Sequence, residues 1–543
     1  MHFKQALKAS CAFFDNRYGA TDLFMLKALR VIFAIVCLAA VTLLFVDFTG
    51  FAAGHWGWLA KIQFVPALLS LNLLVVAALV VLTLVFGRLY CSVICPLGVF
   101  QDFINWLHNH FGGKRAKRNN RFRYHAPHKK LRLSFLTLFV VMIAVGIVGL
   151  SSTAFAAAGL IEPYSAYGRI ATQLFAPVYD AGNNVLADMS AASDNYDFYH
   201  VLPRFAWPVF IVAALTFIVV VTFAWIGGRN YCNIVCPVGT VLGYLSKYSL
   251  LKPVIDKSKC NGCRKCERNC KASCIDGHNH VIDYTRCVTC FDCIGNCSQH
   301  AISYRPALRK KAADQGAEAK TETKADSKTD AGRRSFIITG AAIAGGLVAR
   351  AAVKGDGGLA PVKDKKRPER ETQVVPPGAI SASHLNARCT SCQLCINSCP
   401  EGVLKPSTDI ESFMHPVSYY TDGWCRPDCT TCGDVCPVGA IVSLDPAEKS
   451  STKIGTAKVD LDTCISASAG QQCGNCERHC PAGAITMAPV SDAPGAHLRP
   501  IVDEAACIGC GACEYHCPVG TAGIIRADHS AIHVEGVDVH RLI

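Results

Sequence analysis

The chain has 543 residues, of which 51% are hydrophobic and only 17% charged, and this composition excludes a single small soluble domain and indicates a membrane protein. Its 31 cysteines, spread over so long a chain, exclude a short secreted disulfide scaffold and favour metal ligation. The net charge of +13 does not indicate nucleic-acid binding, because nine Lys and Arg gather at 108–132, between apolar runs where membrane topology places positive charge.

Four apolar runs in the first 230 residues predict membrane-spanning helices, which need about 20 residues. The connection 108–132 has no acidic residue, whereas 160–203 has five and Arg169 as its only Lys or Arg. The positive-inside rule makes the first connection cytoplasmic and the second external. We therefore expect residues 1–250 to form an α-helical membrane domain with both ends in the cytoplasm and spans at 31–46, 62–87, 133–159 and 205–228.

A sequence repeat closes the second and fourth predicted spans. It reads GRLYCSVICPLG at 87–98 and GRNYCNIVCPVG at 228–239, so each copy contains a CxxxCP motif. Both spans run from outside to inside, which predicts parallel repeats with the cysteines at the cytoplasmic face. Two interpretations stay open: the thiols hold a further metal or cluster or cycle between dithiol and disulfide, or the motif is a structural turn. The four cysteines are Cys91, Cys95, Cys232 and Cys236.

Residues 251–306 contain two copies of the C-x2-C-x2-C-x3-C spacing with which bacterial ferredoxins bind [4Fe–4S] clusters. Three cysteines of each copy hold one cluster and the fourth reaches the other, so we expect a cytoplasmic α+β ferredoxin-like domain. Lys271 and Ser298 replace the proline that usually follows the fourth cysteine, and Cys274 is a spare. Spacing favours Cys270 over Cys274 as the remote ligand. The predicted ligands are Cys260, Cys263, Cys266, Cys270, Cys287, Cys290, Cys293 and Cys297.

A polar segment at 307–332 cannot bury a core and is predicted to be a disordered linker. Arg333 and Arg334 follow it and precede the apolar run 336–349, a pattern typical of a twin-arginine export signal. We expect this internal signal, at 333–353, to direct the rest of the chain to the twin-arginine translocase after folding. Cleavage at a nearby A-x-A pattern and retention as a short fifth anchor both stay open.

The predicted exported domain, residues 354–543, contains four more quartets that all end in Cys-Pro. The first and last keep the ferredoxin spacing, the second widens its first gap, and the third has ISASAGQQ between its first two cysteines. We expect four exported [4Fe–4S] clusters, about six in all, and no haem, flavin or nucleotide, because no motif for them stands out. The ligands are Cys389, Cys392, Cys395, Cys399, Cys425, Cys429, Cys432, Cys436, Cys464, Cys473, Cys476, Cys480, Cys507, Cys510, Cys513 and Cys517.

The order of these motifs resembles two known proteins joined in one chain. Four spans with CxxxCP repeats and a trailing two-cluster ferredoxin are similar to the NapH-type membrane subunit of periplasmic nitrate reductase systems. A twin-arginine signal with four quartets is similar to its NapG-type partner. The resemblance implies a protein of the bacterial cytoplasmic membrane with a periplasmic C-terminal domain, which passes electrons from the quinone pool to a periplasmic reductase or carrier. Resemblance to four-cluster ferredoxin subunits suggests that exported quartets pair first with fourth and second with third, with pairing of neighbours as the alternative.

Quinol oxidation releases two protons, so a carboxylate or imidazole near the outer ends of the spans is chemically useful. Glu162 and His55 are the candidates, although Trp56 and Trp58 beside His55 are equally typical of an interfacial aromatic belt. The leading hypothesis is therefore a quinol dehydrogenase. The alternatives are a transmembrane conduit fed by a cytoplasmic ferredoxin without quinone, and an assembly factor that supplies electrons to an exported metalloenzyme.

Overall fold

The computed structural model describes residues 20–111, 122–148, 153–192, 198, 200–201, 206–306, 365–491, 496–520 and 527–543. The predicted linker and export signal lie outside these residues.

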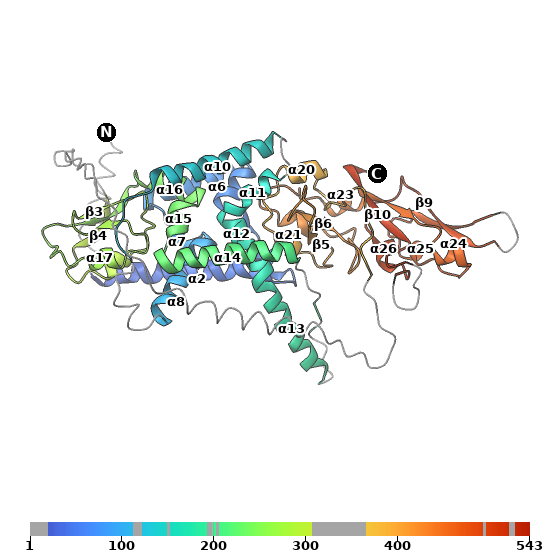
Figure 1. Ribbon diagram of the computed structural model, residues 1–543, viewed down its shortest axis with the longest axis horizontal. Helices are drawn as coiled ribbons and strands as arrows, with labels where there is room; N and C mark the ends of the chain where they lie inside the picture. The colour runs from blue at the N-terminus through green and yellow to red at the C-terminus, as the bar shows by residue number, and fades with distance from the viewer. Residues whose placement is uncertain are drawn as a thin grey trace, which may run out of the picture.

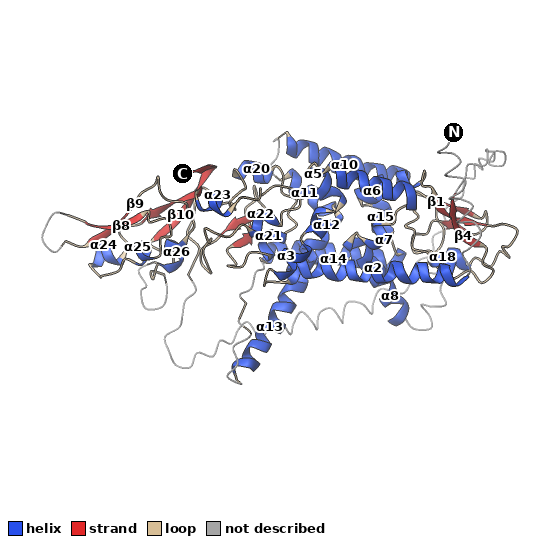
Figure 2. Cartoon of the chain, turned by 180° about the vertical axis from the view of Figure 1, so that it is seen from behind, coloured by secondary structure: helices blue, strands red, loops and turns tan. Residues whose placement is uncertain are grey.

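Three parts follow one another along the longest axis of the molecule. A helical domain (20–246) lies in the middle, a two-site domain (251–306) at one end, and a four-site domain (365–543) at the other (Figure 1). Among the described residues, strands occur only in the two end domains (Figure 2). The two groups of ferredoxin-type cysteine quartets are therefore separated by the helical domain.

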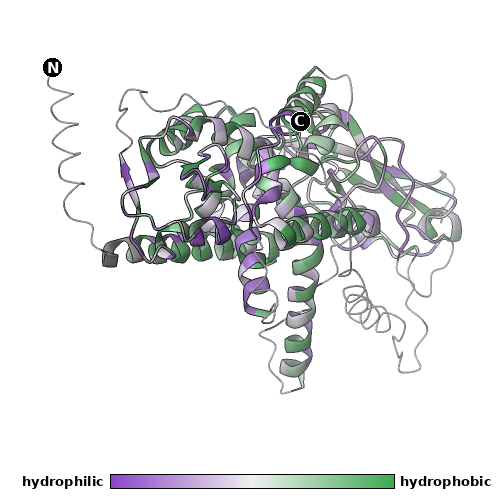
Figure 3. Ribbon diagram, turned by 60° about the vertical axis from the view of Figure 1, so that its left-hand side comes forward, coloured by the Kyte–Doolittle hydropathy of each residue, from purple (hydrophilic) through white to green (hydrophobic). Residues whose placement is uncertain are grey.

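Three helices of the described residues are long and apolar enough to cross a membrane. They lie in α2 (Ala20–Val46), α10 (Lys129–Ile147) and α14 (Trp207–Gly227). Large apolar side chains on their outer faces, such as Phe33 and Ile218, are more than half exposed, and hydrophobic residues follow these helices along their length (Figure 3). Such continuous apolar surface is expected where a protein contacts lipid.

The prediction of four continuous spans is not confirmed over the described residues. The run 62–87 divides into α5 (Phe64–Leu69) and α6 (Leu73–Phe86), because Leu71 between them has a left-handed φ of 56°. The 14 residues of α6 rise about 21 Å, less than the roughly 30 Å hydrocarbon core of a bilayer. The run 133–159 also divides, since α10 ends at Ile147 and α11 (Ala154–Ile161) is a separate helix.

Shorter helices fill and flank this frame. One continuous stretch leads from α12 (Pro163–Ile170) through a π-helical segment (Ala171–Phe175) into α13 (Ala176–Ala191), which projects from the body (Figure 1). The others are α3 (Phe51–Trp56), α4 (Trp58–Lys61), α7 (Tyr90–Val93), α8 (Pro96–Phe111), α15 (Asn230–Ile234) and α16 (Pro237–Ser246).

The sequence repeat folds into the same unit twice. In each copy a glycine with a φ near 70°, Gly87 or Gly228, ends the long helix, a short helix carries the first cysteine, and a proline begins the next helix. The copies exchange equivalent contacts, because Arg88 donates to the Cys232 carbonyl and Arg229 donates to the Cys91 carbonyl. These reciprocal bonds relate α6–α7–α8 and α14–α15–α16 by an approximate twofold arrangement.

Small antiparallel sheets support the cysteine segments of both end domains. In the two-site domain β1 (Leu251–Ile255) pairs with β4 (Ile302–Pro306) and β2 (Ile275–Asp276) pairs with β3 (Val281–Ile282). In the four-site domain the pairs are β5 (Leu404–Pro406) with β6 (Pro416–Ser418), β7 (Thr452–Val459) with β10 (Ile532–Leu542), and β8 (Ile485–Pro489) with β9 (Leu498–Val502). The short helices are α17 (Lys265–Arg268), α18 (Asp292–Gly295), α20 (Ala382–Asn386), α21 (Leu394–Asn397), α22 (Thr431–Asp434), α23 (Pro446–Ser450), α24 (Ile465–Ala469), α25 (Asn475–Arg478) and α26 (Ala512–His516).

Candidate metal centres

One local geometry recurs in the quartets of the end domains. In five of the six, the residue after the second cysteine of the quartet has a positive φ and caps the short helix that carries the third cysteine. The quartet of Cys425 is the exception, because Thr430 holds this place with a φ of −114°. The left-handed residues are Arg264, Phe291, Gln393, Gly474 and Gly511.

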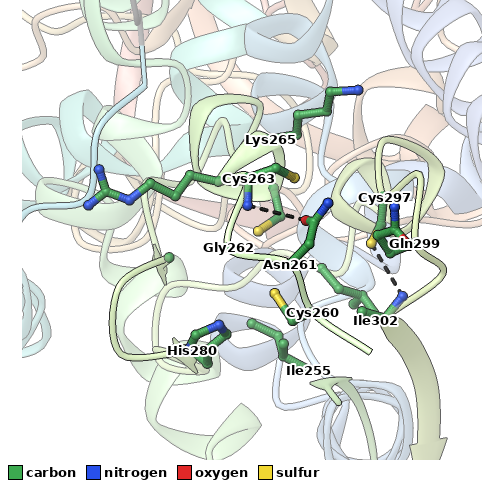
Figure 4. Close-up of a pocket in the computed structure, with 14 residues that line it drawn as sticks. Ile255, Cys260, Asn261, Gly262, Cys263, Lys265, His280, Cys297, Gln299 and Ile302 are labelled. Atoms are coloured by element: carbon green, nitrogen blue, oxygen red, sulfur yellow. Dashed lines mark hydrogen bonds between the residues drawn. The ribbon is translucent and has the colours of Figure 1, made fainter. Parts of the chain in front are cut away.

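The first centre of the two-site domain collects three thiols from one quartet and one from the other. Cys260, Cys263 and Cys266 line a cavity together with Cys297, and Figure 4 labels Cys260, Cys263 and Cys297 around it. The backbone N–H of Ala301 donates to the Cys297 sulfur over 3.3 Å. This arrangement is the one predicted from the interlocked ferredoxin spacing.

The second centre contains five cysteines rather than four. Cys287, Cys290 and Cys293 line a cavity with Cys270 and Cys274, whose sulfurs are 3.5 Å apart. The hydrogen bond from the Cys274 thiol lowers the pKa of Cys270 to about 7, and the same contact raises the pKa of Cys274. Cys270 also interacts electrostatically with Cys290 and Cys293. Both candidates for the remote ligand therefore lie at this centre, and the preference for Cys270 stays a prediction from the spacing.

The first two quartets of the four-site domain pair with each other. Cys389, Cys392 and Cys395 each interact with Cys436, the last cysteine of the second quartet. Reciprocally, Cys399 lines one cavity with Cys425, Cys429 and Cys432. The suggested pairing of first with fourth quartet is wrong for this chain, because the last cysteine of the first quartet lies with the second quartet and that of the second lies with the first.

The third and fourth quartets also pair as neighbours. Cys476 interacts with Cys464, Cys473 and Cys517, so the last cysteine of the fourth quartet completes the third. Cys480 in turn lines a cavity with Cys507, Cys510 and Cys513. The ISASAGQQ insertion forms α24 beside this pair without displacing Cys464 from it.

The four centres of this domain form a series that leads away from the helical domain. The backbone N–H of Cys425 donates to the Cys510 carbonyl over 2.9 Å, so the second centre adjoins the centre of Cys507, Cys510 and Cys513. Tyr420 strengthens this junction by donating to the Gly509 carbonyl. Helices α24 and α25, which flank the last centre, lie at the far end of the molecule, whereas α21 lies against the helical domain (Figure 1).

Because each quartet supplies its last cysteine to the neighbouring centre, substitution of that cysteine tests the pairing. Cys436→Ser is expected to abolish or convert the centre of Cys389, Cys392 and Cys395, although Cys436 belongs to another sequence quartet. Cys399→Ser is expected to disturb the centre of Cys425 instead. Electron paramagnetic resonance of the dithionite-reduced variants, recorded together with iron content, checks both assignments. If each variant disturbed the quartet in which it lies, the observed pairing would be refuted.

The first centre of the four-site domain is built against the helical domain. Arg169 of α12 donates to the Ser391 carbonyl (3.4 Å), Gln173 donates to Gln393 (2.8 Å), and Asn397 donates to the Asp47 carbonyl (3.0 Å). Two glycines permit this close approach: a Cβ on Gly159 would lie 2.3 Å from the Thr390 carbonyl oxygen, and one on Gly168 would lie 2.6 Å from that of Cys392. Both partners are buried, so the two domains share one core.

The four CxxxCP cysteines converge inside the helical domain. Each is at most 4% exposed, and Cys236 interacts electrostatically with Cys232, Cys95 and Cys91. The surrounding helices and the two-site domain cover the thiols, because Arg88 beside them donates to the Thr285 and Arg286 carbonyls. Their position at the cytoplasmic face stays a prediction. Sequence reasoning missed Arg88 and Arg229 as their neighbours, although the arginine repeats in both GR-x-YC segments.

The two quinol-site candidates lie in different environments. Glu162 is 1% exposed and caps α12, accepting hydrogen bonds from the backbone N–H groups of Tyr164 and Ser165. It also interacts electrostatically with Cys392 of the first centre. His55 is exposed and its ring stacks on Phe51 at 4.2 Å. A role for either residue with quinol stays a prediction.

The chemistry of the donor sets fits iron–sulfur clusters. Within the described residues no three His, Cys, Asp or Glu side chains are close enough to hold a single metal ion. A cluster separates its four thiolates by its own iron and sulfide, so wider cysteine spacing suits it. Burial raises the pKa of Cys392 and Cys510 to about 12, so their thiolate forms require the positive charge that iron supplies.

Comparisons with known protein families agree with this chemistry. A family model described as a 4Fe-4S binding domain matches residues 70–116 and 207–257, which contain the CxxxCP repeats. A model described as a 4Fe-4S dicluster domain matches residues 471–521. No solved structure matches the chain.

Curated relatives are all matched over part of this chain. The methylamine utilization ferredoxin-type protein MauM of Methylobacillus flagellatus is 30% identical over 155 residues, 27% of this chain and 64% of MauM. MauM of Methylophilus methylotrophus is 32% identical over 152 residues, 26% of this chain and 66% of its own. The ferredoxin-type protein NapG of Escherichia coli is 30% identical over 195 residues, 34% of this chain and 79% of NapG. The chain thus spans slightly under two thirds of the length of the MauM proteins.

Proposed function

Because the chain belongs to the family of the ferredoxin-type protein NapG and carries 4Fe-4S binding domains, we propose that this iron–sulfur protein conducts electrons across the bacterial cytoplasmic membrane. Electrons enter at the two-site domain in the cytoplasm and leave through the four-site domain in the periplasm. They pass to an exported reductase or electron carrier there. Six [4Fe–4S] clusters supply the reversible one-electron chemistry.

The observation that carries this proposal is the succession of cysteine centres from one end of the molecule to the other. In space, the helical domain lies between the two-site domain and the four-site domain (Figure 1). Two centres lie on one side of it, the CxxxCP cysteines lie inside it, and four centres lie on the other side. The first of the four shares its core with helical residues, so no partner has to dock between them. The predicted internal twin-arginine signal supports the periplasmic position of the last four.

Quinol oxidation is the second candidate, and one observation favours it. Glu162 places a carboxylate beside the first centre of the four-site domain, on the helical side of the junction. A quinol bound near this carboxylate would reduce that centre directly, and the cytoplasmic pair would then serve another partner. The resemblance to quinol-oxidising NapH-type and NapG-type proteins supports this route as well.

Proteoliposomes that contain the full chain distinguish the two routes. The vesicles expose the two-site domain on their outside, and reduced low-potential ferredoxin is added there. This donor is expected to bleach the iron–sulfur absorbance of all centres. The bleaching is expected to fall at least about tenfold in Cys287→Ser, which removes a ligand of the second centre. If only a quinol analogue reduces the four-site domain, and Cys287→Ser does not affect it, the quinol route replaces the conduit. Reduction by neither donor would refute both.

A further inference from the structure

We propose that Cys91, Cys95, Cys232 and Cys236 together ligate one iron–sulfur centre inside the helical domain, with Arg88 as its buried counter-charge. This CxxxCP centre joins the two-site domain to the four-site domain. Its role in electron transfer rests on the proposed function, but its metal content does not.

The position of the four thiols is the first argument. They come from two turns of the same construction, so the twofold arrangement of the repeat brings two pairs together from opposite sides. Polar N–H groups point at the sulfurs: the Gln101 amide donates to Cys232 over 3.1 Å and the Gly239 backbone to Cys236 over 3.3 Å. Such donors stabilise sulfur that carries negative charge, as in the ligand shells of iron–sulfur proteins.

The charge of Arg88 is the second argument. Its side chain is fully buried and donates to Asn233 (2.9 Å), the Cys232 carbonyl (3.4 Å) and the Cys91 sulfur (3.9 Å). No ion pair between Arg88 and a carboxylate occurs in the described part of the chain, whereas Arg229, its counterpart in the repeat, pairs with Asp102 at 2.8 Å.

Burial of a guanidinium without a counter-ion is unfavourable, and four neutral thiols would not supply the missing negative charge. Four thiolates around iron and sulfide carry a net negative charge, which Arg88 then balances. The described residues contain no preformed site for a single metal ion, here or in the ferredoxin quartets, which is compatible with a centre in which several irons hold the thiolates apart.

The connections on both sides are the third argument. Towards the two-site domain, Arg88 also donates to the carbonyls of Thr285 and Arg286, and the latter precedes the ligand Cys287. Towards the four-site domain, Tyr231, next to Cys232, donates to the Ile161 carbonyl over 3.1 Å.

Arg169 completes this second connection. It donates to the Gly159 carbonyl over 2.7 Å and to the Ser391 carbonyl next to Cys392. A single electron that leaves the Cys287 centre oxidises it and reduces the CxxxCP centre, which then reduces the Cys392 centre. No bond forms or breaks and no proton has to move.

Iron analysis of the anaerobically purified full chain tests the metal site. The double variant Cys91→Ser/Cys232→Ser is expected to lose about two to four iron atoms per chain and one Mössbauer component. Cys37→Ser is the matched control, because Cys37 lies in α2 outside every centre and its variant should keep all iron. The signals of the ferredoxin-type clusters show that each variant has folded. Unchanged iron in the double variant, or zinc in the wild type at these cysteines, would overturn the proposal.

Arg88→Gln tests the counter-charge without removing a ligand. Loss of a positive charge beside an anionic centre is expected to make its reduction potential more negative, while iron content stays near that of the wild type. Redox titration followed by electron paramagnetic resonance measures this shift. An unchanged potential would overturn the assignment of Arg88.

The link is tested separately. Double-variant protein that lacks the CxxxCP iron should no longer pass electrons from reduced ferredoxin to the four-site domain. If the four-site domain were still reduced at the wild-type rate, the centre would be present but would not be the link. If even the wild type failed with ferredoxin, the proposed function would fall while the iron result stood.

Discussion

Replacement of Asp102 by asparagine is expected to lower the free energy of unfolding of the helical domain by about 3–5 kcal/mol. One Asp102 oxygen forms ion pairs with Arg229 (2.8 Å), Arg30 (3.2 Å) and Lys271 (2.9 Å), and the other accepts a hydrogen bond from Nε of Arg229. The guanidinium of Arg229 is fully buried. The neutral amide leaves these cations without their carboxylate, and Arg229 cannot reach water. Unfolding in mixed detergent–SDS micelles, followed by helical circular dichroism, measures the loss.

The matched control for this variant is Asp528→Asn. Asp528 also forms an ion pair, with Lys366 at 2.6 Å, but both side chains are more than half exposed. Water replaces such a partner, so no measurable change in stability is expected. Equal effects of the two variants would contradict the assignment of Asp102 as the buried anion that joins α2, α8, α15 and the two-site domain.

Alanine at both Gly159 and Gly168 is expected to separate the four-site domain from the helical domain. Each added methyl group would overlap backbone of the Thr390–Cys392 segment, and that of Gly168 would also lie 2.8 Å from the Phe45 ring. Overpacking of this kind costs about 1–3 kcal/mol at each position. Hydrogen exchange of the backbone amides of residues 389–397 is therefore expected to accelerate at least about tenfold.

Gly182→Ala provides the control, because it lies in helix α13 and a Cβ there would meet nothing within 4 Å. Alanine in a helix interior is more favourable than glycine by up to about 1 kcal/mol, so this variant should be neutral or slightly stabilised. Unchanged exchange at 389–397 in the double variant would mean that the junction tolerates the added atoms and is looser than the contacts indicate.

The cysteine spacing predicted the local part of the ferredoxin-type sites. The C-x2-C-x2-C-x3-C pattern specifies three thiols on one short turn, and the structure has this turn at Cys260 and Cys389 alike. Spacing favoured Cys270 over Cys274, and the structure places both beside the second centre. Which quartet supplies the fourth ligand depends on how two separate turns pack, so a sequence pattern could not decide between neighbours and distant partners.

Hydropathy predicted the helical domain but not how its apolar runs divide into helices. An apolar run shows where a segment can be buried, not whether it remains one helix. The left-handed Leu71 shortens α6 to 14 residues. Glu162 caps α12 and Pro163 begins it, and Arg169 of this helix reaches the four-site domain. These features arise from packing between distant segments, which a topology rule does not describe. The repeated arginine before each CxxxCP motif was the signal available in the sequence.

The contacts of Arg169, Gln173 and Asn397 with residues 391–397 have a consequence for processing of the chain. Because these contacts and the shared core hold residues 365–543 against the helices, a peptidase cut within 307–364 should yield two polypeptides that remain one particle. The covalent link between the halves would then ensure that they are synthesised in equal numbers, whereas the contacts would keep them attached. A cell that made the halves from two genes would assemble the same complex.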